Sequence, residues 1–226
     1  GNADGTVTVV DLRPGSPLGT DTLTGIELFV FNDDELANPY PTDPNFGMTL
    51  SGTPFDDILI GDSGNDTITG FAGNDRLFGD DGNDSIVAGL GNDVLDGGSG
   101  NDDLRGDEGI DHIYAGSGSD VVSGGADGDI IYGGQGADQI SGDGGNDEIY
   151  DENGLNVIHG NDGNDTIYAD GEIYGDAGAD RIGHFYNYAE GTIYGGADDD
   201  TIYAAGALAS GGTGMRRSGQ SRICRR

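Results

Sequence analysis

The chain has 226 residues, including 46 glycines, and 42 acidic residues face nine arginines and no lysine, for a formal net charge of −33. A surface this acidic repels nucleic acid and anionic lipid and attracts cations, so nucleic-acid binding is excluded. No run of about twenty apolar residues is present, so a membrane span is not expected. The single cysteine, Cys224, excludes an internal disulfide.

Residues 1–51 form a flank of their own. Thr6–Leu12 alternates and Gly25–Phe31 runs apolar, as strands do, and three prolines between residues 39 and 44 then break the chain. We expect this flank to form a β cap that covers the exposed end of the fold that follows. Because the chain begins with Gly and has no signal peptide, we also expect it to be a piece of a longer protein.

A nine-residue repeat occupies residues 52–203. Thirteen copies run from Gly52 to Tyr168 without an insertion, and GGSGNDDLR at residues 97–105 is one of them. The eighth place of every copy is a branched aliphatic residue, and after a shortened copy at residues 169–174 the pattern resumes. These residues are Leu59, Ile68, Leu77, Ile86, Leu95, Leu104, Ile113, Val122, Ile131, Ile140, Ile149, Ile158, Ile167, Ile173, Ile182, Ile193 and Ile202. A disordered acidic chain would not maintain such a regular spacing, so the repeat indicates an ordered fold.

The period predicts strands and turns. A helix needs apolar spacings of three and four, whereas each copy has one apolar residue between two outward ones, which is typical of a three-residue strand at places seven to nine. Glycines at places one, two and four permit a tight turn before it. Tyr114, Tyr132, Tyr150 and Tyr168 are eighteen residues apart, which predicts two copies per coil and stacked rings on one outward face. The predicted fold is all-β, a parallel β-roll or β-solenoid.

The sixth place predicts a metal site. It holds Asp57, Asp66, Asp75, Asp84, Asp93, Asp102, Asp111, Asp120, Asp129, Asp138, Asp147 and Asp165, with Asn156 as the exception, and Asp180 and Asp200 match after the shortened copy. Stacked coils place these carboxylates in two columns at about one strand spacing, ~4.8 Å. Such columns need a counter-charge, and calcium accepts carboxylate and turn carbonyl oxygens. Ten pairs between Asp57 and Asp165 predict about ten calcium ions that stabilise the folded state. Three scattered histidines and one cysteine make zinc a poor fit.

Two copies, residues 97–105 and 133–141, match G-G-x-G-x-D-x-U-x at every specified place. The chain therefore resembles the RTX, or haemolysin-type, calcium-binding family. The resemblance implies a β-roll with calcium in its turns, export through a bacterial type I secretion channel, and folding outside the cell. Copies that depart from the motif, at residues 151–156, 169–174 and 186–194, predict weakened metal sites.

We expect a non-catalytic calcium-binding module of a secreted bacterial protein, which folds on calcium binding after export. Two alternatives remain open. One is an adhesion or polysaccharide-binding module that binds a surface glycan with its tyrosine face. The other is the C-terminal piece of an exported hydrolase or alginate epimerase, whose catalytic domain would precede Gly1. Residues 204–226 are expected to be an irregular basic tail.

Overall fold

The structure, a computed structural model, describes residues 6–10, 20–24, 28–30, 47–183, 191–203, 208–210 and 216–217. Most of the predicted cap and basic tail therefore lies outside the described residues. Within the cap region, β1 (Thr6–Val10) pairs antiparallel with β2 (Thr20–Thr24) as a separate two-stranded sheet. The part of the chain that the structure describes contains no long apolar helix of the kind that crosses a membrane.

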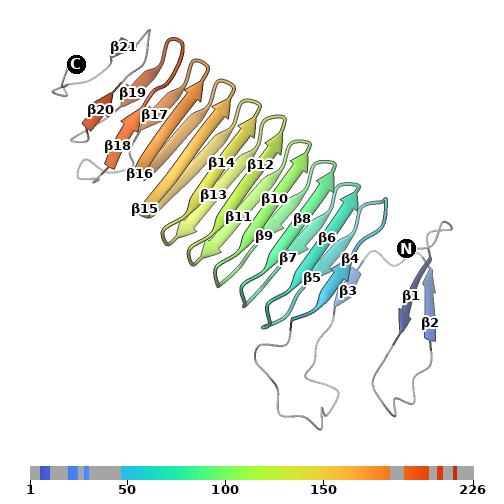
Figure 1. Ribbon diagram of the computed structural model, residues 1–226. Helices are drawn as coiled ribbons and strands as arrows, with labels where there is room; N and C mark the ends of the chain where they lie inside the picture. Colours follow the sequence, from blue (N-terminus) through green and yellow to red (C-terminus); the bar gives the residue numbers. More distant parts are fainter. Residues whose placement is uncertain are drawn as a thin grey trace.

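The other strands pair in parallel and wind into a β-roll with two faces (Figure 1). The first face contains β3 (Leu28–Val30), β5 (Ile58–Ile60), β7 (Arg76–Phe78), β9 (Val94–Asp96), β11 (His112–Ser117), β13 (Ile130–Gln135), β17 (Arg181–Gly183), β19 (Thr201–Tyr203) and β21 (Arg216–Arg217). The second face contains β4 (Thr49–Ser51), β6 (Thr67–Ala72), β8 (Ser85–Leu90), β10 (Asp103–Glu108), β12 (Val121–Ala126), β14 (Gln139–Gly144), β18 (Gly191–Tyr194) and β20 (Leu208–Ser210). The two long strands β15 (Glu148–Asp162) and β16 (Thr166–Ala177) run through both faces.

The predicted coil of eighteen residues is confirmed by the strand register. Ile113 pairs with Ile131, and Val122 pairs with Ile140, each eighteen residues further along. The register shifts once, between Asp151 and Asn156, where β15 meets β16. The shift arises because the copy at residues 169–174 lacks three residues, so the chain passes this corner in extended conformation instead of turning.

The eighth-place residues form the core, as predicted. All seventeen are buried, and most of them are completely inaccessible to solvent. Leu50 of β4 joins the same core, so parallel pairing and burial extend to the N-terminal side of Gly52. The core thus consists of two facing rows of mainly aliphatic side chains, one row from each face, and the turns lie along the two edges of the roll.

Several strands are longer than the predicted three residues. In β6, β8, β10, β12 and β14 of the second face, and in β11 and β13, pairing continues at places two and three, as between Asp107 and Gly125. The expected positive dihedral angles occur at places two and four, and Gly100 at place four has a φ of 138°. Place one holds glycine in most copies for a different reason. Glycines such as Gly97 have ordinary φ values, but a Cβ atom there would be crowded.

Candidate metal centre

The sixth-place aspartates line the two edges of the roll. All fourteen predicted residues are buried. Backbone contacts join them into a long column and a short column. The long column is Asp57, Asp75, Asp93, Asp111, Asp129, Asp147, Asp165, Asp180 and Asp200. The short column is Asp66, Asp84, Asp102, Asp120 and Asp138, and it ends at Asn156. The long column therefore passes the shortened copy, with partners fifteen and then twenty residues apart.

One oxygen of each carboxylate holds the coils together. The backbone N–H of Asp84 donates to Oδ1 of Asp102 at 2.8 Å, and Asp102 donates to Oδ1 of Asp120 at 2.8 Å. The same contact recurs along both columns. Each column is thus a ladder of charge-assisted hydrogen bonds from one coil to the next.

The second oxygen, Oδ2, is buried without a hydrogen-bond partner in most of these residues. They are Asp75, Asp84, Asp93, Asp102, Asp111, Asp120, Asp129, Asp138, Asp147, Asp165, Asp180 and Asp200. The first coil differs, because Oδ2 of Asp57 accepts from Thr53 and Oδ2 of Asp66 accepts from the N–H of Asp62. A buried, unpaired carboxylate oxygen is costly, so these twelve atoms require a proton or a cation.

The glycine at place one leaves room beside this oxygen. A Cβ added at Gly79 would lie less than 3.0 Å from both Oδ2 of Asp84 and the carbonyl oxygen of Gly97 in the next coil. The same pair of oxygens converges at ten glycines: Gly52, Gly61, Gly70, Gly79, Gly97, Gly106, Gly124, Gly142, Gly160 and Gly175. Ala88 and Ala115 occupy place one in two copies, so a methyl group stands there. Elsewhere a carboxylate and a carbonyl oxygen face one atom-sized space.

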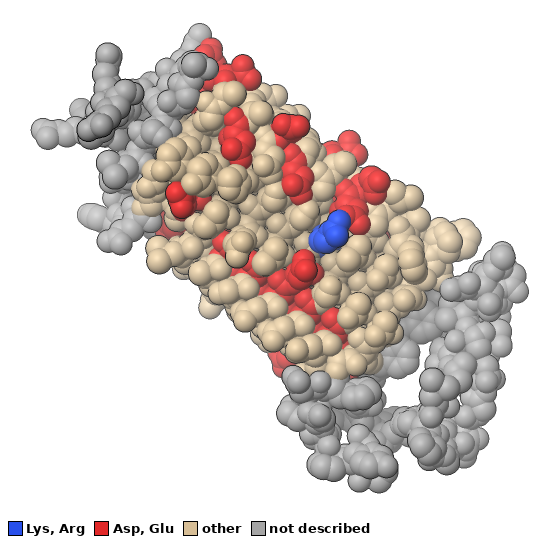
Figure 2. All heavy atoms as spheres, viewed as in Figure 1, with Lys and Arg blue, Asp and Glu red and all other residues tan. Residues whose placement is uncertain are grey.

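Burial makes these carboxylates hard to ionise without a counter-charge. Desolvation, followed by the charges of neighbouring aspartates, raises the pKa of Asp102 from 3.8 to about 6, against the effect of its backbone hydrogen bond. The same causes raise the pKa of Asp147 to about 7 and that of Asp129 to about 8. Figure 2 shows acidic side chains in rows along the roll, with one small basic patch on that face.

The donor set fits calcium. Every converging atom is an oxygen, from a carboxylate or a backbone carbonyl, and calcium prefers such ligands in irregular geometry. Among the described residues, no group of three or more Asp, Glu, His or Cys side chains is gathered around one point. The carboxylates instead follow one another along each column, so backbone oxygens of the turns would have to complete each coordination shell.

One buried acid was missed by the sequence analysis. Asp151 stands at place one of its copy, where most copies have glycine, and it is as buried as the sixth-place residues. Both of its carboxylate oxygens lack a hydrogen-bond partner. The sequence signal was present, because an acid at a place that elsewhere holds glycine or alanine is a marked departure from the repeat.

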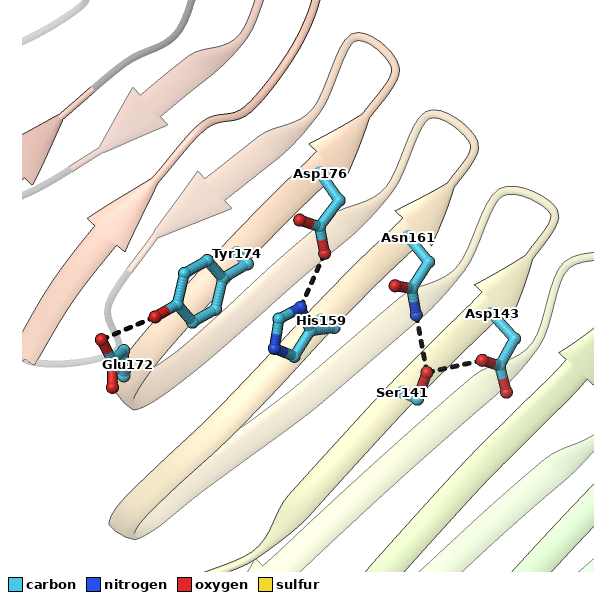
Figure 3. A network of polar contacts seen from close by, with 7 residues as sticks. All are labelled: Ser141, Asp143, His159, Asn161, Glu172, Tyr174 and Asp176. Carbon is cyan, nitrogen blue, oxygen red and sulfur yellow. Dashed lines mark hydrogen bonds and ion pairs between the residues drawn. The ribbon is translucent and has the colours of Figure 1, made fainter.

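A polar network on the second face lacks the geometry of a catalytic triad (Figure 3). Nδ1 of His159 lies 2.7 Å from Oδ2 of Asp176. The hydroxyl of Ser141, beside His159 in the register, donates to Asp143 at 2.7 Å and accepts from Asn161 at 2.6 Å. Because its only proton points to Asp143, Ser141 is not activated by His159 as a nucleophile.

The predicted tyrosine ladder is present. Tyr114, Tyr132, Tyr150 and Tyr168 stack with centroid distances of 5.1, 5.3 and 6.1 Å. A second stack on the other face joins His159, Tyr174 and Tyr194. Sugar rings stack on open aromatic faces, whereas these rings cover one another. The arrangement therefore favours a stabilising role for the tyrosines over the glycan-binding alternative.

Parallel coils with a buried carboxylate column at each edge define a cation-binding β-solenoid, a structural and non-catalytic module. The model of the RTX calcium-binding nonapeptide repeat matches residues 51–86, 78–113, 105–140, 114–149, 141–172 and 192–206, together more than half of the chain. The chain thus belongs to this family, which supports calcium as the ion. No curated protein and no solved structure matches it.

Proposed function

We propose that the roll is a calcium-switched folding module of a secreted bacterial protein. The observation that carries the proposal is the row of twelve buried Oδ2 atoms without hydrogen-bond partners. In the folded state these carboxylate oxygens need a counter-charge, whereas in the unfolded chain water solvates them. Calcium bound only by the folded state therefore shifts the equilibrium toward the roll.

The intervals between successive carboxylates of the two columns suggest where the ions bind. Eight intervals separate successive carboxylates of the long column, and four separate those of the short column. One ion per interval gives twelve, two more than the sequence predicted, because the long column continues to Asp180 and Asp200. Twelve divalent ions would reduce the formal charge from −33 to −9.

The proposed domain limits follow the same logic. Residues 52–203 form the calcium-dependent part of the roll, because the carboxylate columns lie there. Strands β3 and β4 of residues 1–51 pair onto its first coils, and β20 and β21 of the basic residues 204–226 pair onto its last ones. Calcium is abundant outside cells, where modules commonly bind it at ~10⁻⁴–10⁻³ M. A chain kept unfolded by low calcium inside the cell suits export through a type I secretion channel, with folding afterwards.

Calcium titration followed by circular dichroism tests the proposal. The metal-free chain near neutral pH should lack most of its β signal, and millimolar calcium should restore it. Magnesium is the control, because it requires a tighter octahedral shell and keeps its water. An equally strong β signal with excess chelator would refute the proposal, as would equal responses to the two ions.

A further inference from the structure

The irregular coil at residues 151–159 replaces one carboxylate with another at a different place. Its sixth place is Asn156, so the short column loses a charge there. Its first place is Asp151, where the other described copies have glycine or alanine. Both residues and Asp138 of the preceding coil are about 1% exposed. This copy therefore still has one buried carboxylate, but the carboxylate stands at place one instead of place six.

Asn156 replaces only one of the two roles of a sixth-place aspartate, which is the hydrogen bond between coils. Its Oδ1 accepts the backbone N–H of Asp138 at 3.0 Å, which continues the hydrogen-bond ladder of the short column. Its Nδ2 occupies the place of the second oxygen, makes no hydrogen bond of good geometry, and lies near Asp151. An amide nitrogen cannot bind a cation, so the interval after Asp138 needs another oxygen donor.

Asp151 supplies oxygens at that interval. A Cβ added at Gly133 would lie less than 3.0 Å from Oδ2 and Cγ of Asp151. At ten other first-place glycines, the carboxylate in this position is the sixth-place aspartate of the same copy. The carboxylate of Asp151 therefore enters the space that opens beside Gly133, on the coil that also carries Asp138.

No hydrogen bond of good geometry reaches Oδ2 of Asp138 or either carboxylate oxygen of Asp151. Asp138 and Asn156 nevertheless lie close enough to Asp151 to affect its pKa. The ion pairs of the described side chains lie elsewhere, at Arg105 with Asp107 and at His159 with Asp176. Asn156 also lines a groove with Leu155, Val157 and Gly171.

We propose that Asp138 and Asp151 bind a calcium ion together at the irregular coil, in a site that the repeat pattern does not predict. Asp151 donates from place one in the role that the sixth-place carboxylate has elsewhere. Burial first, and then the charge of Asp138, raise the pKa of Asp151 to about 8, which agrees with a carboxylate that lacks its counter-ion. The proposal rests on calcium binding by the regular columns.

Native mass spectrometry of the calcium-loaded chain tests it by counting ions. Asp151→Asn should bind one calcium fewer than the wild type, because it removes the charge and keeps the volume. The double variant Asp151→Gly with Asn156→Asp restores the regular motif and should recover the wild-type number. Asp103→Asn makes the same change in charge at an exposed position and should lose none.

The outcomes separate this site from the columns. An unchanged ion number in folded Asp151→Asn would overturn the proposal and show that Asp138 and Asp151 share a proton instead. Absence of bound calcium from every protein would contradict the proposed function itself. If Asp151→Asn fails to fold, calcium anomalous scattering from wild-type crystals decides, since a peak is expected between Asp138 and Asp151. Peaks along the columns without one there would also overturn the proposal.

Discussion

Asp102→Asn should change stability in opposite directions with and without calcium. Asp102 lies inside the short column, between Asp84 and Asp120, so it borders two proposed ion intervals. With calcium at about one hundred times Kd, each ion stabilises the fold by ~2.7 kcal/mol. Loss of two ions would cost roughly 5 kcal/mol, and the stabilisation of about 3 kcal/mol that the same substitution brings to the metal-free fold offsets part of it. The net loss of roughly 2 kcal/mol lowers Tm by roughly 5–10 °C in a domain of this size.

Without calcium the same substitution should stabilise the roll. The pKa of Asp102 is raised from 3.8 to about 6, so its ionised form near neutral pH opposes folding by about 3 kcal/mol. Asparagine keeps the Oδ1 that accepts from Asp84, and its amide can donate to the carbonyl of Ala115, which faces the same space. The variant should refold in chelator at a lower osmolyte concentration than the wild type.

Thermal unfolding in about 10 mM calcium and osmolyte refolding in chelator, both followed by circular dichroism, measure the two effects. Asp103→Asn is the control, because its exposed neighbouring carboxylate loses the same charge. The reasoning is refuted if Asp102→Asn destabilises the fold equally under both conditions, or if the two variants behave alike.

Three further predictions concern pH, the core and the turns. In chelator, the folded state binds more protons than the unfolded state from about pH 4 up to its raised aspartate pKa values of about 6 to 8, so stability falls as pH rises through this window. The β signal in chelator should therefore grow on acidification to about pH 5, whereas calcium affinity should weaken; a β signal that declines on acidification in chelator would contradict the pKa argument. Ile131→Ala should cost ~2–5 kcal/mol in calcium-loaded denaturant unfolding, since Ile131 is fully buried, and the half-exposed Ile110→Ala should cost far less; equal costs would contradict a core built on the eighth-place residues. Gly100→Ala should lower Tm by an amount equivalent to ~1–3 kcal/mol, because its φ is 138° and the added Cβ would collide with the carbonyl of Gly82, while Gly144→Ala meets only an ordinary contact and serves as the control.

Much of the fold could be predicted because the repeat ties one inward side chain to each half-coil. The aliphatic residue at place eight fixes the register, so Ile113 above Ile131 follows directly from the spacing. The pattern did not show that places two and three also pair, as Asp107 does with Gly125, because the residues at these places carry no hydrophobic signal. Nor did it show that the long column continues from Asp165 to Asp180, since the missing residues break the count although the turn remains in register.

The sequence predicted the kind of site, a calcium site built on sixth-place carboxylates, but not every residue and atom that forms it. The periodicity identified the sixth-place carboxylates, whereas the different environments of their two oxygens depend on coordinates. Asp151 was missed because a count at place six cannot find an acid at place one. Its burial becomes clear only when coils are stacked and the space beside Gly133 is seen to hold its carboxylate.

The two oxygens of each sixth-place aspartate have separable roles. Oδ1 binds the backbone of the preceding coil and needs no charge for this, as Asn156 shows by accepting from Asp138. In twelve of the fourteen, Oδ2 has no such partner and is stabilised only by a proton or a cation. Because an interior carboxylate borders two intervals, the ions and the coils stabilise one another along the roll, as in other repeat proteins. Calcium dependence thus arises from the second oxygen, and coil-to-coil order arises from the first.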